Sequence, residues 1–364
     1  MVVIGQREVA KVAEPPGVGR SGQRVRGRRA LLGLTALVLV AAAVAAGVAA
    51  GLPDRWFGPR PLPMTIAVGF NPVGVAVDPV AHRAYVTSGT GNSVWVIDTT
   101  HNVVVATIQV GNYPQGVAVD PAAHRAYVTS GHSLSVLDTR RNAVVATLDA
   151  DSMPAGVAID LATHRAYLAA PGINLVQVFD IQRNAYVATI PVGELKELSS
   201  SAAAIALDPV AHRAYLAVSG MLGFPSHSVA VIDTDATFIV DTIRVGLMPV
   251  GVALDPAAHR AYVTNGRGDS VSVLDTRSDA AIAGIRVGSF PSGVALDPSA
   301  HRAYVANFNG NSVSVIDTRR NAVVATLPVG HGPRAVAVDP TTHRVYVANQ
   351  DDGTVSVLQD GAGS

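Results

Sequence analysis

Short runs of hydrophobic residues, several of them alternating with polar ones, follow one another along the chain from residue 64 onward. The run at 312–317, Ser-Val-Ser-Val-Ile-Asp, shows the clearest alternation, which is typical of a half-buried β-strand. The runs at 116–120, 125–129 and 323–329 are equally short and rich in Val, which favours strands. No stretch within this region reads clearly as a long helix. The pattern therefore predicts an all-β domain.

These four strand patterns recur as a unit seven times. Successive units are spaced by 42, 40, 48, 47, 42 and 42 residues. A period near 40 residues with four short strands per repeat is typical of a β-propeller, in which each repeat forms one blade. Each unit carries one His-Arg pair, and the seven histidines are His82, His124, His164, His212, His259, His301 and His343.

The two ends of the repeat region complement each other. The seventh unit ends after its third strand pattern, at 355–358, with a short tail at 361–364. A spare fourth strand pattern, Met-Thr-Ile-Ala-Val-Gly, precedes the first unit at 64–69 and resembles 188–193. Pairing both ends in one blade would remove an unpaired sheet edge. We therefore predict a seven-bladed β-propeller over 64–360, closed by an N-terminal strand.

The repeated Asp, His, Arg and Tyr invite a catalytic interpretation, because Asp-x-x-x-His-Arg combines a carboxylate with an imidazole. Sevenfold repetition favours a structural role instead, since every blade needs the same group. We expect the imidazoles to be buried and hydrogen-bonded, holding each turn onto the next strand. We expect the seven repeat tyrosines to fill the space between blades.

One further motif occurs in phase with the repeat. It reads Tyr-Val-Thr-Asn at 262–265, with variants at 85–88, 127–130 and 304–307. On this motif the region 64–360 resembles the YVTN-family β-propeller proteins of prokaryotic surface layers and exported proteins. The resemblance implies a propeller with an exported or surface location and a binding or scaffolding role. It implies no catalytic residues, and units three and four depart from the pattern.

Charge is unevenly distributed, although the formal net charge is zero. Residues 1–60 contain nine Lys/Arg and three Asp/Glu, whereas residues 61–364 contain 18 and 24. An acidic repeat region is a poor electrostatic partner for nucleic acid. Because the chain has no Cys, disulfides, thiolate metal sites and covalently attached c-type haem are excluded.

The N-terminal region predicts a membrane anchor. A basic segment at 1–29 precedes 30–52, which is uncharged over 23 residues and long enough to form a transmembrane helix. The arginines place the N-terminus in the cytoplasm, and a Pro-rich linker follows at 53–63. The alternative is a signal with a twin-arginine-like pair at 28–29, cleaved near 43–45 to give a secreted protein. Both interpretations place the propeller outside the cytoplasm.

Two insertions set units three and four apart from the others, at 192–204 and 218–228. Both lie on the face of variable loops, opposite the short uniform turns, so we expect them to form one raised lip. An apolar centre with a charged rim is typical of protein-binding patches; the alternative is a tolerated, solvated insertion. The candidate binding residues of the lip are Glu194, Lys196, Glu197, Met221, Leu222, Phe224 and His227.

The mouth of the central channel on this face is a second candidate site. Residues beside the Pro of each connection between blades vary, and aromatic and Met side chains there suit an apolar or sugar-like ligand. The alternative is that they only cover the ends of the inner strands. These residues are Asn71, Tyr113, Met153, Met248, Phe290 and Arg334, of which Tyr113, Phe290 and Arg334 are the preferred candidates.

The sequence contains no Gly-rich phosphate loop, nucleophile elbow or paired-His metal motif. His132, His227 and His331 lie outside the repeat pattern but in different units, which disfavours a shared metal site. We therefore predict no catalytic or metal-binding residues and no cofactor. The predicted function is binding or scaffolding of a protein or cell-envelope polymer. The alternatives are a propeller enzyme, such as a lactonase or a quinone- or haem-dependent oxidoreductase, and a structural surface-layer element.

Overall fold

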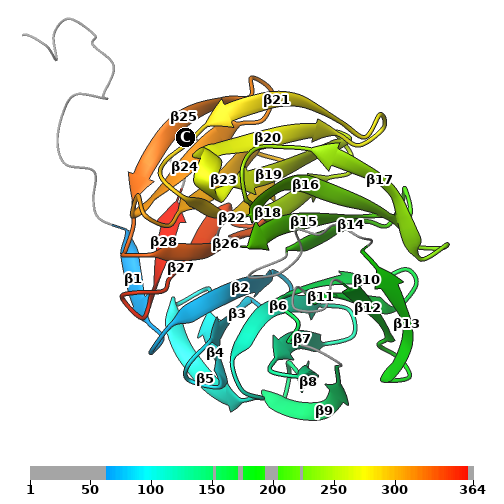
Figure 1. Ribbon diagram of the computed structural model, residues 1–364. Coiled ribbons are helices and arrows are strands. Elements are labelled where there is room, and N and C mark those ends of the chain that lie inside the picture. The colour runs from blue at the N-terminus through cyan, green and yellow to red at the C-terminus, as the bar shows by residue number, and fades with distance from the viewer. Residues whose placement is uncertain (1–62, 151–152, 171–174, 193–203, 222–223, 360–364) are drawn as a thin grey trace, which may run out of the picture. The chain divides into compact units, whose positions relative to one another are not determined.

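A computed structural model describes residues 63–150, 153–170, 175–192, 204–221 and 224–359. The predicted basic segment, membrane anchor, linker and C-terminal tail lie outside these ranges. Within them, no helix is long and apolar enough to cross a membrane. The strands form seven four-stranded antiparallel sheets around a central axis, which confirms the predicted seven-bladed β-propeller (Figure 1).

Each blade contains an inner strand, two middle strands and an outer strand, in that order from the axis. The inner strands are β2 (Pro72–Asp78), β6 (Pro114–Asp120), β10 (Gly156–Asp160), β14 (Ile205–Asp208), β18 (Pro249–Asp255), β22 (Pro291–Asp297) and β26 (Pro333–Asp339). The second strands are β3 (Arg83–Ser88), β7 (Arg125–Ser130), β11 (Arg165–Ala170), β15 (Arg213–Met221), β19 (Arg260–Asn265), β23 (Arg302–Asn307) and β27 (Arg344–Asn349). The third strands are β4 (Ser93–Asp98), β8 (Ser133–Asp138), β12 (Leu175–Asp180), β16 (Phe224–Asp233), β20 (Ser270–Asp275), β24 (Ser312–Asp317) and β28 (Thr354–Gln359). The outer strands are β5 (Val103–Gln109), β9 (Ala143–Asp149), β13 (Ala185–Pro191), β17 (Phe238–Arg244), β21 (Ala280–Arg286), β25 (Ala322–Pro328) and β1 (Met64–Ala67).

The N-terminal strand closes the ring as predicted. Strand β1 pairs antiparallel with β28, with Met64 opposite Val357, and lies beside it in Figure 1. Just beyond β1, Val68 N donates a hydrogen bond to Gly353 O at 3.0 Å. Ile66 and Val68 are buried in a cluster shared by the seventh and first blades. Pairing of β1 with β28 therefore both hydrogen-bonds an otherwise unpaired strand edge and buries apolar surface.

Tyrosines of the second strands fill the space between blades, as predicted. All seven are buried, and burial raises the pKa of Tyr85 to about 12. The Tyr346 hydroxyl donates to Thr99 O at 3.4 Å, and Arg344 Nη1 donates to the same carbonyl at 2.6 Å. These two bonds join the seventh blade to the first. The hydroxyl of Tyr215 in the fourth blade likewise donates a hydrogen bond to Asp279 Oδ1 of the fifth blade at 2.9 Å.

The repeat histidines do not have the buried side chains that we predicted from the sequence. All seven are exposed or half-buried, with φ between 51° and 55°. His is among the few non-glycine residues that adopt this left-handed conformation readily. The backbone then accepts a bond from the turn that follows the third strand, as from Thr139 N to His124 O at 3.1 Å. Histidine therefore recurs at this position mainly because it adopts the left-handed backbone conformation that each turn needs.

One histidine does reach across to a neighbouring blade. His343 Nδ1 lies 2.6 Å from Oδ2 of Asp297, whose side chain is fully buried. Oδ1 of the same carboxylate accepts bonds from Ser299 Oγ and Ala300 N. Burial alone would raise the pKa of Asp297, but these hydrogen bonds outweigh it and hold the pKa below its ordinary value.

We expect His343→Ala to lower the free energy of unfolding by about 1–3 kcal/mol more than His124→Ala at pH 7, because it leaves Asp297 Oδ2 buried without a partner. His124 is the matched control: it has the same backbone conformation, but its Nε2 contacts Arg140 Nη2 at the surface. Denaturant titration of both variants measures the difference. Since the folded pKa is lowered, the difference should shrink only below the ordinary Asp pKa of about 3.9. Equal losses at pH 7 would contradict this role.

Candidate ligand site at the axial mouth

One end of the propeller collects the connections into the inner strands and the loops after the second strands. Backbone hydrogen bonds hold these two sets together, from Gly266 N to Met248 O at 2.7 Å and from Phe308 N to Phe290 O at 2.9 Å. Met248 and Phe290 adopt left-handed conformations with φ of 59° and 52° just before a Pro. The grouping of the variable segments on one face is therefore as predicted.

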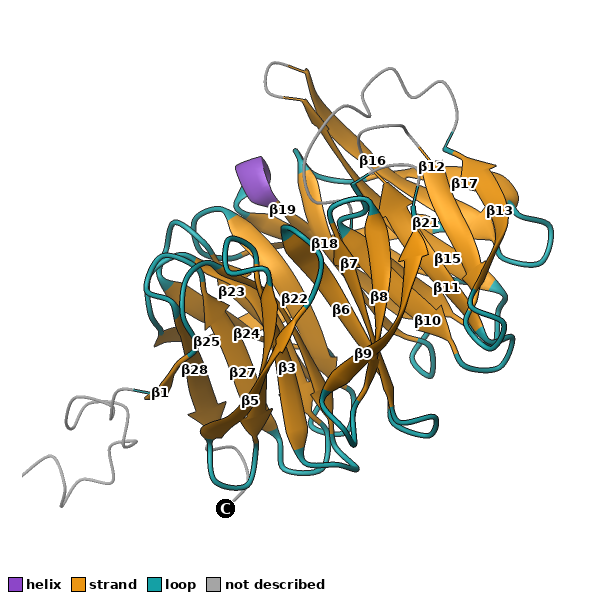
Figure 2. Cartoon of the chain, turned by 90° about the horizontal axis from the view of Figure 1, so that it is seen from below, coloured by secondary structure: helices purple, strands orange, loops and turns teal. Residues whose placement is uncertain are grey.

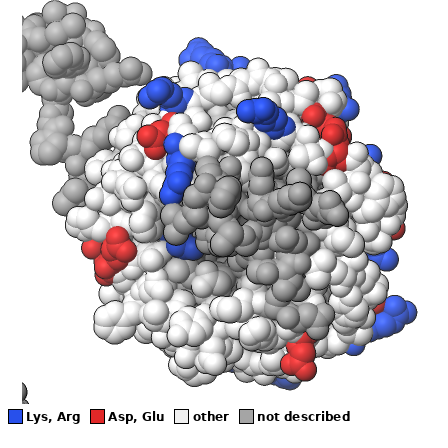
Figure 3. Space-filling model, viewed as in Figure 1, with Lys and Arg blue, Asp and Glu red and all other residues white. Residues whose placement is uncertain are grey.

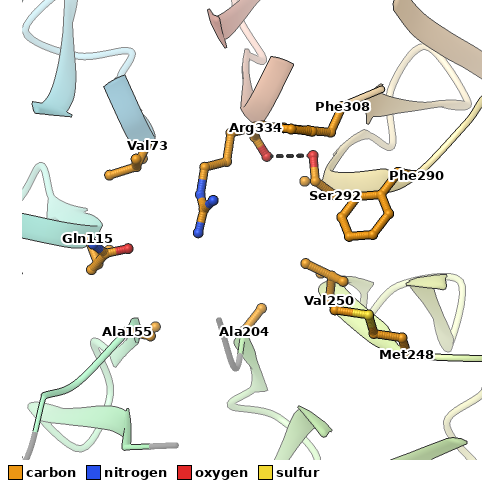
Figure 4. Close-up of a pocket in the computed structure, with 15 residues that line it drawn as sticks. Val73, Gln115, Ala155, Ala204, Met248, Val250, Phe290, Ser292, Phe308 and Arg334 are labelled. Carbon is orange, nitrogen blue, oxygen red and sulfur yellow. Dashed lines mark hydrogen bonds between the residues drawn. The ribbon is translucent and has the colours of Figure 1, made fainter. Parts of the chain in front are cut away.

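A cavity of about 320 Å³ lies at this end of the axis (Figure 4). Its walls are largely apolar, and the polar side chains in its lining are those of Gln115, Ser292 and Arg334. The lining residues are Val73, Gly74, Gln115, Gly116, Ala155, Gly156, Ala204, Met248, Val250, Gly251, Phe290, Ser292, Gly293, Phe308 and Arg334.

The residue directly after the connection Pro contributes to this lining in six blades. These equivalent positions are Val73, Gln115, Ala155, Val250, Ser292 and Arg334. The sequence pattern predicted Arg334 at this position, but in the other blades it predicted the residue before the Pro. An alignment of the repeats at the position after the Pro would have found the set. This position is apolar, polar or charged in different units, whereas the Pro before it recurs in all six and the Gly after it in five.

The inner strands approach one another closely around the cavity. A Cβ on Gly116 would lie 2.6 Å from Ala155 O, and one on Gly293 would lie 2.8 Å from Arg334 O. Hydroxyl groups bridge the same gaps, from Thr129 Oγ1 to Ala155 O at 3.1 Å and from Ser292 Oγ to Arg334 O at 2.8 Å. The second of these bonds is drawn in Figure 4. Ala155 and Arg334 are thus held from the neighbouring blade through their own backbones.

Arg334 projects from the seventh blade toward the centre of the ring (Figure 4). Its Nη1 donates to Gln350 Oε1 at 3.1 Å, and no carboxylate of the described residues forms an ion pair with it. Desolvation lowers the pKa of the guanidinium from its ordinary value. In the neighbouring sixth blade, Phe290 and Phe308 meet edge to face with ring centroids 6.2 Å apart. The site therefore combines one cation with an aromatic and aliphatic wall.

Not all the predicted mouth residues meet here. Phe290, Arg334 and Met248 line the cavity, whereas Asn71, Tyr113 and Met153 do not. Tyr113 is 56% exposed, and its backbone N donates to Asn92 Oδ1 at 3.1 Å.

The predicted lip is only partly described. Glu194, Lys196, Glu197 and Leu222 lie outside the described residues. Met221 and Phe224 end β15 and begin β16, opposite each other in the pairing, and the carbonyl of His227 accepts a bond from Val245 N at 2.6 Å. The second insertion therefore lengthens a hairpin instead of forming a loop: β15 and β16 have 9 and 10 residues, against six in β19 and β20. Figure 2 shows this hairpin on the same side as the 3-10 turn η3 (Gly266–Gly268).

Charged groups are scattered over the described surface. Figure 3 shows Lys/Arg and Asp/Glu as separate groups, mostly toward the rim of the face in view. His331 Nδ1 contacts Asp352 Oδ1 at 2.8 Å. Over the ranges that the structure describes, no group of three or more His, Asp or Glu residues is placed to hold a metal ion.

Comparison with known proteins supports the fold. No model of a protein family matches the chain, and no curated protein matches it. Among solved structures, the chain is similar to hydrazine synthase of Kuenenia stuttgartiensis, with a TM-score of 0.71 and 20% identity over 86% of this chain and all of that one. At this identity the likeness shows the fold alone. With 1626 matching solved chains, the fold does not select a function.

We expect Gly293→Ala to destabilise the protein by about 1–3 kcal/mol, because its Cβ would meet backbone atoms of the seventh blade that cannot move aside independently. Gly284, on the outer strand β21, is the matched control, since nothing lies within 4 Å of its added Cβ. Gly284→Ala should be neutral or stabilise by up to about 1 kcal/mol. Thermal and denaturant unfolding of both variants measures the contrast, and an equal effect would rule out close approach at the mouth.

Proposed function

We propose that this protein is a binding propeller that takes a group of its ligand into the axial mouth. The observation that carries the proposal is the cavity itself, in which the variable position of six repeats brings apolar, polar and charged side chains to one rigid site. Apolar concave sites with a few polar groups are typical of ligand pockets. The inner strands around the mouth hold one another in place, so the cavity is preformed and little ordering is required on binding.

Binding is favoured over catalysis by the chemistry of the lining. Met248, Val250, Phe290 and Phe308 supply apolar surface, and Arg334 supplies a cation. Among the described lining residues there is no carboxylate or imidazole that would form a general acid–base pair with it. A propeller enzyme and a structural surface-layer element are the competing proposals.

The ligand that we propose is a protein or a cell-envelope polymer outside the cytoplasm. The uncharged segment 30–52 would anchor the chain in the membrane and leave the propeller on the outer side. The lengthened β15–β16 hairpin lies on the same face as the mouth, where the partner would also meet it (Figure 2). A net acidic repeat region makes nucleic acid a poor alternative.

A site-specific cross-link tests this proposal, because the protein has no Cys and an introduced thiol is unique. Val250→Cys would place a short photoreactive group in the mouth, and Val105→Cys would place the same group on the outer strand β5, where Val105 is 46% exposed. We expect discrete adducts in intact cells from position 250 and none from position 105. Equal adducts from both positions, or none from position 250, would contradict binding at the mouth.

Membrane attachment is tested separately. If 30–52 is an uncleaved anchor, protease added to intact cells should release or digest the propeller and spare a basic N-terminal fragment. Mature protein that begins near residue 46 would instead establish a cleaved signal.

A further inference from the structure

Arg334 is the one described lining residue with a charged side chain, in a cavity whose other walls are mostly apolar. The equivalent positions of the other described blades carry Val73, Gln115, Ala155, Val250 and Ser292, so the charge is a feature of the seventh blade and not of the repeat. Nothing in the repeat pattern requires a cation here.

The guanidinium has donor capacity to spare. It carries five N–H groups in a planar fork, of which Nη1 bonds to Gln350 Oε1. The described residues offer it no second hydrogen-bond acceptor and no carboxylate. In a site with apolar walls, a charge–charge contact is stronger than it would be in open water. The arrangement therefore favours an anionic occupant.

We propose, building on the proposed function, that the axial mouth recognises a carboxylate joined to an apolar or aromatic body. The fork of Arg334 matches a carboxylate in a two-bond geometry. Gln115 of the second blade lies across from the guanidinium and can donate a further bond from its amide (Figure 4). The body of the ligand would pack against Met248 and Phe290, which lie on the side of the cavity away from Gln115 (Figure 4), and against Phe308.

Other anions and sugars fit this lining less well. A phosphate dianion would bring a second negative charge, and among the described lining residues no second Lys or Arg balances it. The backbone carbonyls of Ala155 and Arg334 already accept hydroxyl bonds from neighbouring blades, which makes them poorer acceptors for the hydroxyls of a sugar. A sugar would require several polar partners, whereas the lining offers polar side chains only from Gln115, Ser292 and Arg334 among the described residues.

Such a carboxylate has two sources, a small free acid or the C-terminus of a polypeptide. Calorimetry on the full-length chain with two matched pairs distinguishes them. The first pair is 3-phenylpropanoate and 3-phenylpropanamide, and the second is N-acetyl-Leu-Phe with a free carboxylate and its C-terminal amide. We expect the acid of at least one pair to bind about 10- to 100-fold more tightly than its amide.

Arg334→Gln should abolish the preference for the acid and leave the affinity for the amide within about twofold, because only the charged contact is lost. Arg334→Lys should restore part of the preference, since it keeps the charge without the fork. If Arg334→Gln unfolds, Gln350→Ala provides a second variant: it frees the guanidinium from its one bond and should weaken acid binding a few-fold.

The outcomes separate this inference from the proposed function. Equal binding of acid and amide, unchanged by Arg334→Gln, would overturn carboxylate recognition and leave the mouth as a binding site. If none of the four compounds binds but the cross-link at position 250 still forms, carboxylate recognition is again overturned and the mouth remains a binding site. Failure of both the compounds and the cross-link would overturn both proposals. A preference confined to the peptide pair would identify a polypeptide C-terminus as the source.

Discussion

The structure depends on the packing of each blade against the next. Each of the seven hydrophobic clusters joins residues of two neighbouring sheets, so no blade buries its core alone. A chain built this way is stable only when the circle is complete, since an open seam would expose one face of two blades. Strand β1 provides that completion: it pairs with β28 and adds Ile66 and Val68 to the cluster between the last and first blades.

The same constraint explains why the axial mouth is suited to binding. Glycines and hydroxyl groups at the inner edge let the blades approach closely and tie their backbones together. The side chain after the Pro can then vary from blade to blade while the backbones stay tied, because these side chains line the cavity; Ser292 also bonds across to Arg334 O of the next blade. The repeated residues hold the blades together, and the residues that differ between blades determine what the cavity can bind.

A residue can recur in every repeat because its backbone conformation is needed or because its side-chain chemistry is needed, and the sequence alone does not distinguish the two. The histidine of every unit satisfies a left-handed φ, and Asn142 and Asn184 do the same in the turns after the third strands. These residue types suggest catalysis or metal binding when they recur, yet their backbone positions explain most of the pattern. His343 is different because its ring also meets buried Asp297.

The sequence by itself determined the number of blades, the strand order and the closure by 64–69. Strand periodicity and turn chemistry are local properties, and the same pattern occurs in all seven repeats. It also located Phe290 and Arg334 as variable residues on one face. Only the tertiary structure decided that Arg334 meets Val73, Gln115 and Val250 in one cavity while Tyr113 stays outside it. In the fifth and sixth blades residues on both sides of the Pro line the cavity, Met248 with Val250 and Phe290 with Ser292, whereas in the second blade only Gln115 does. Which of them face the axis is set by how the inner strands pack around the ring, and no single repeat specifies that packing.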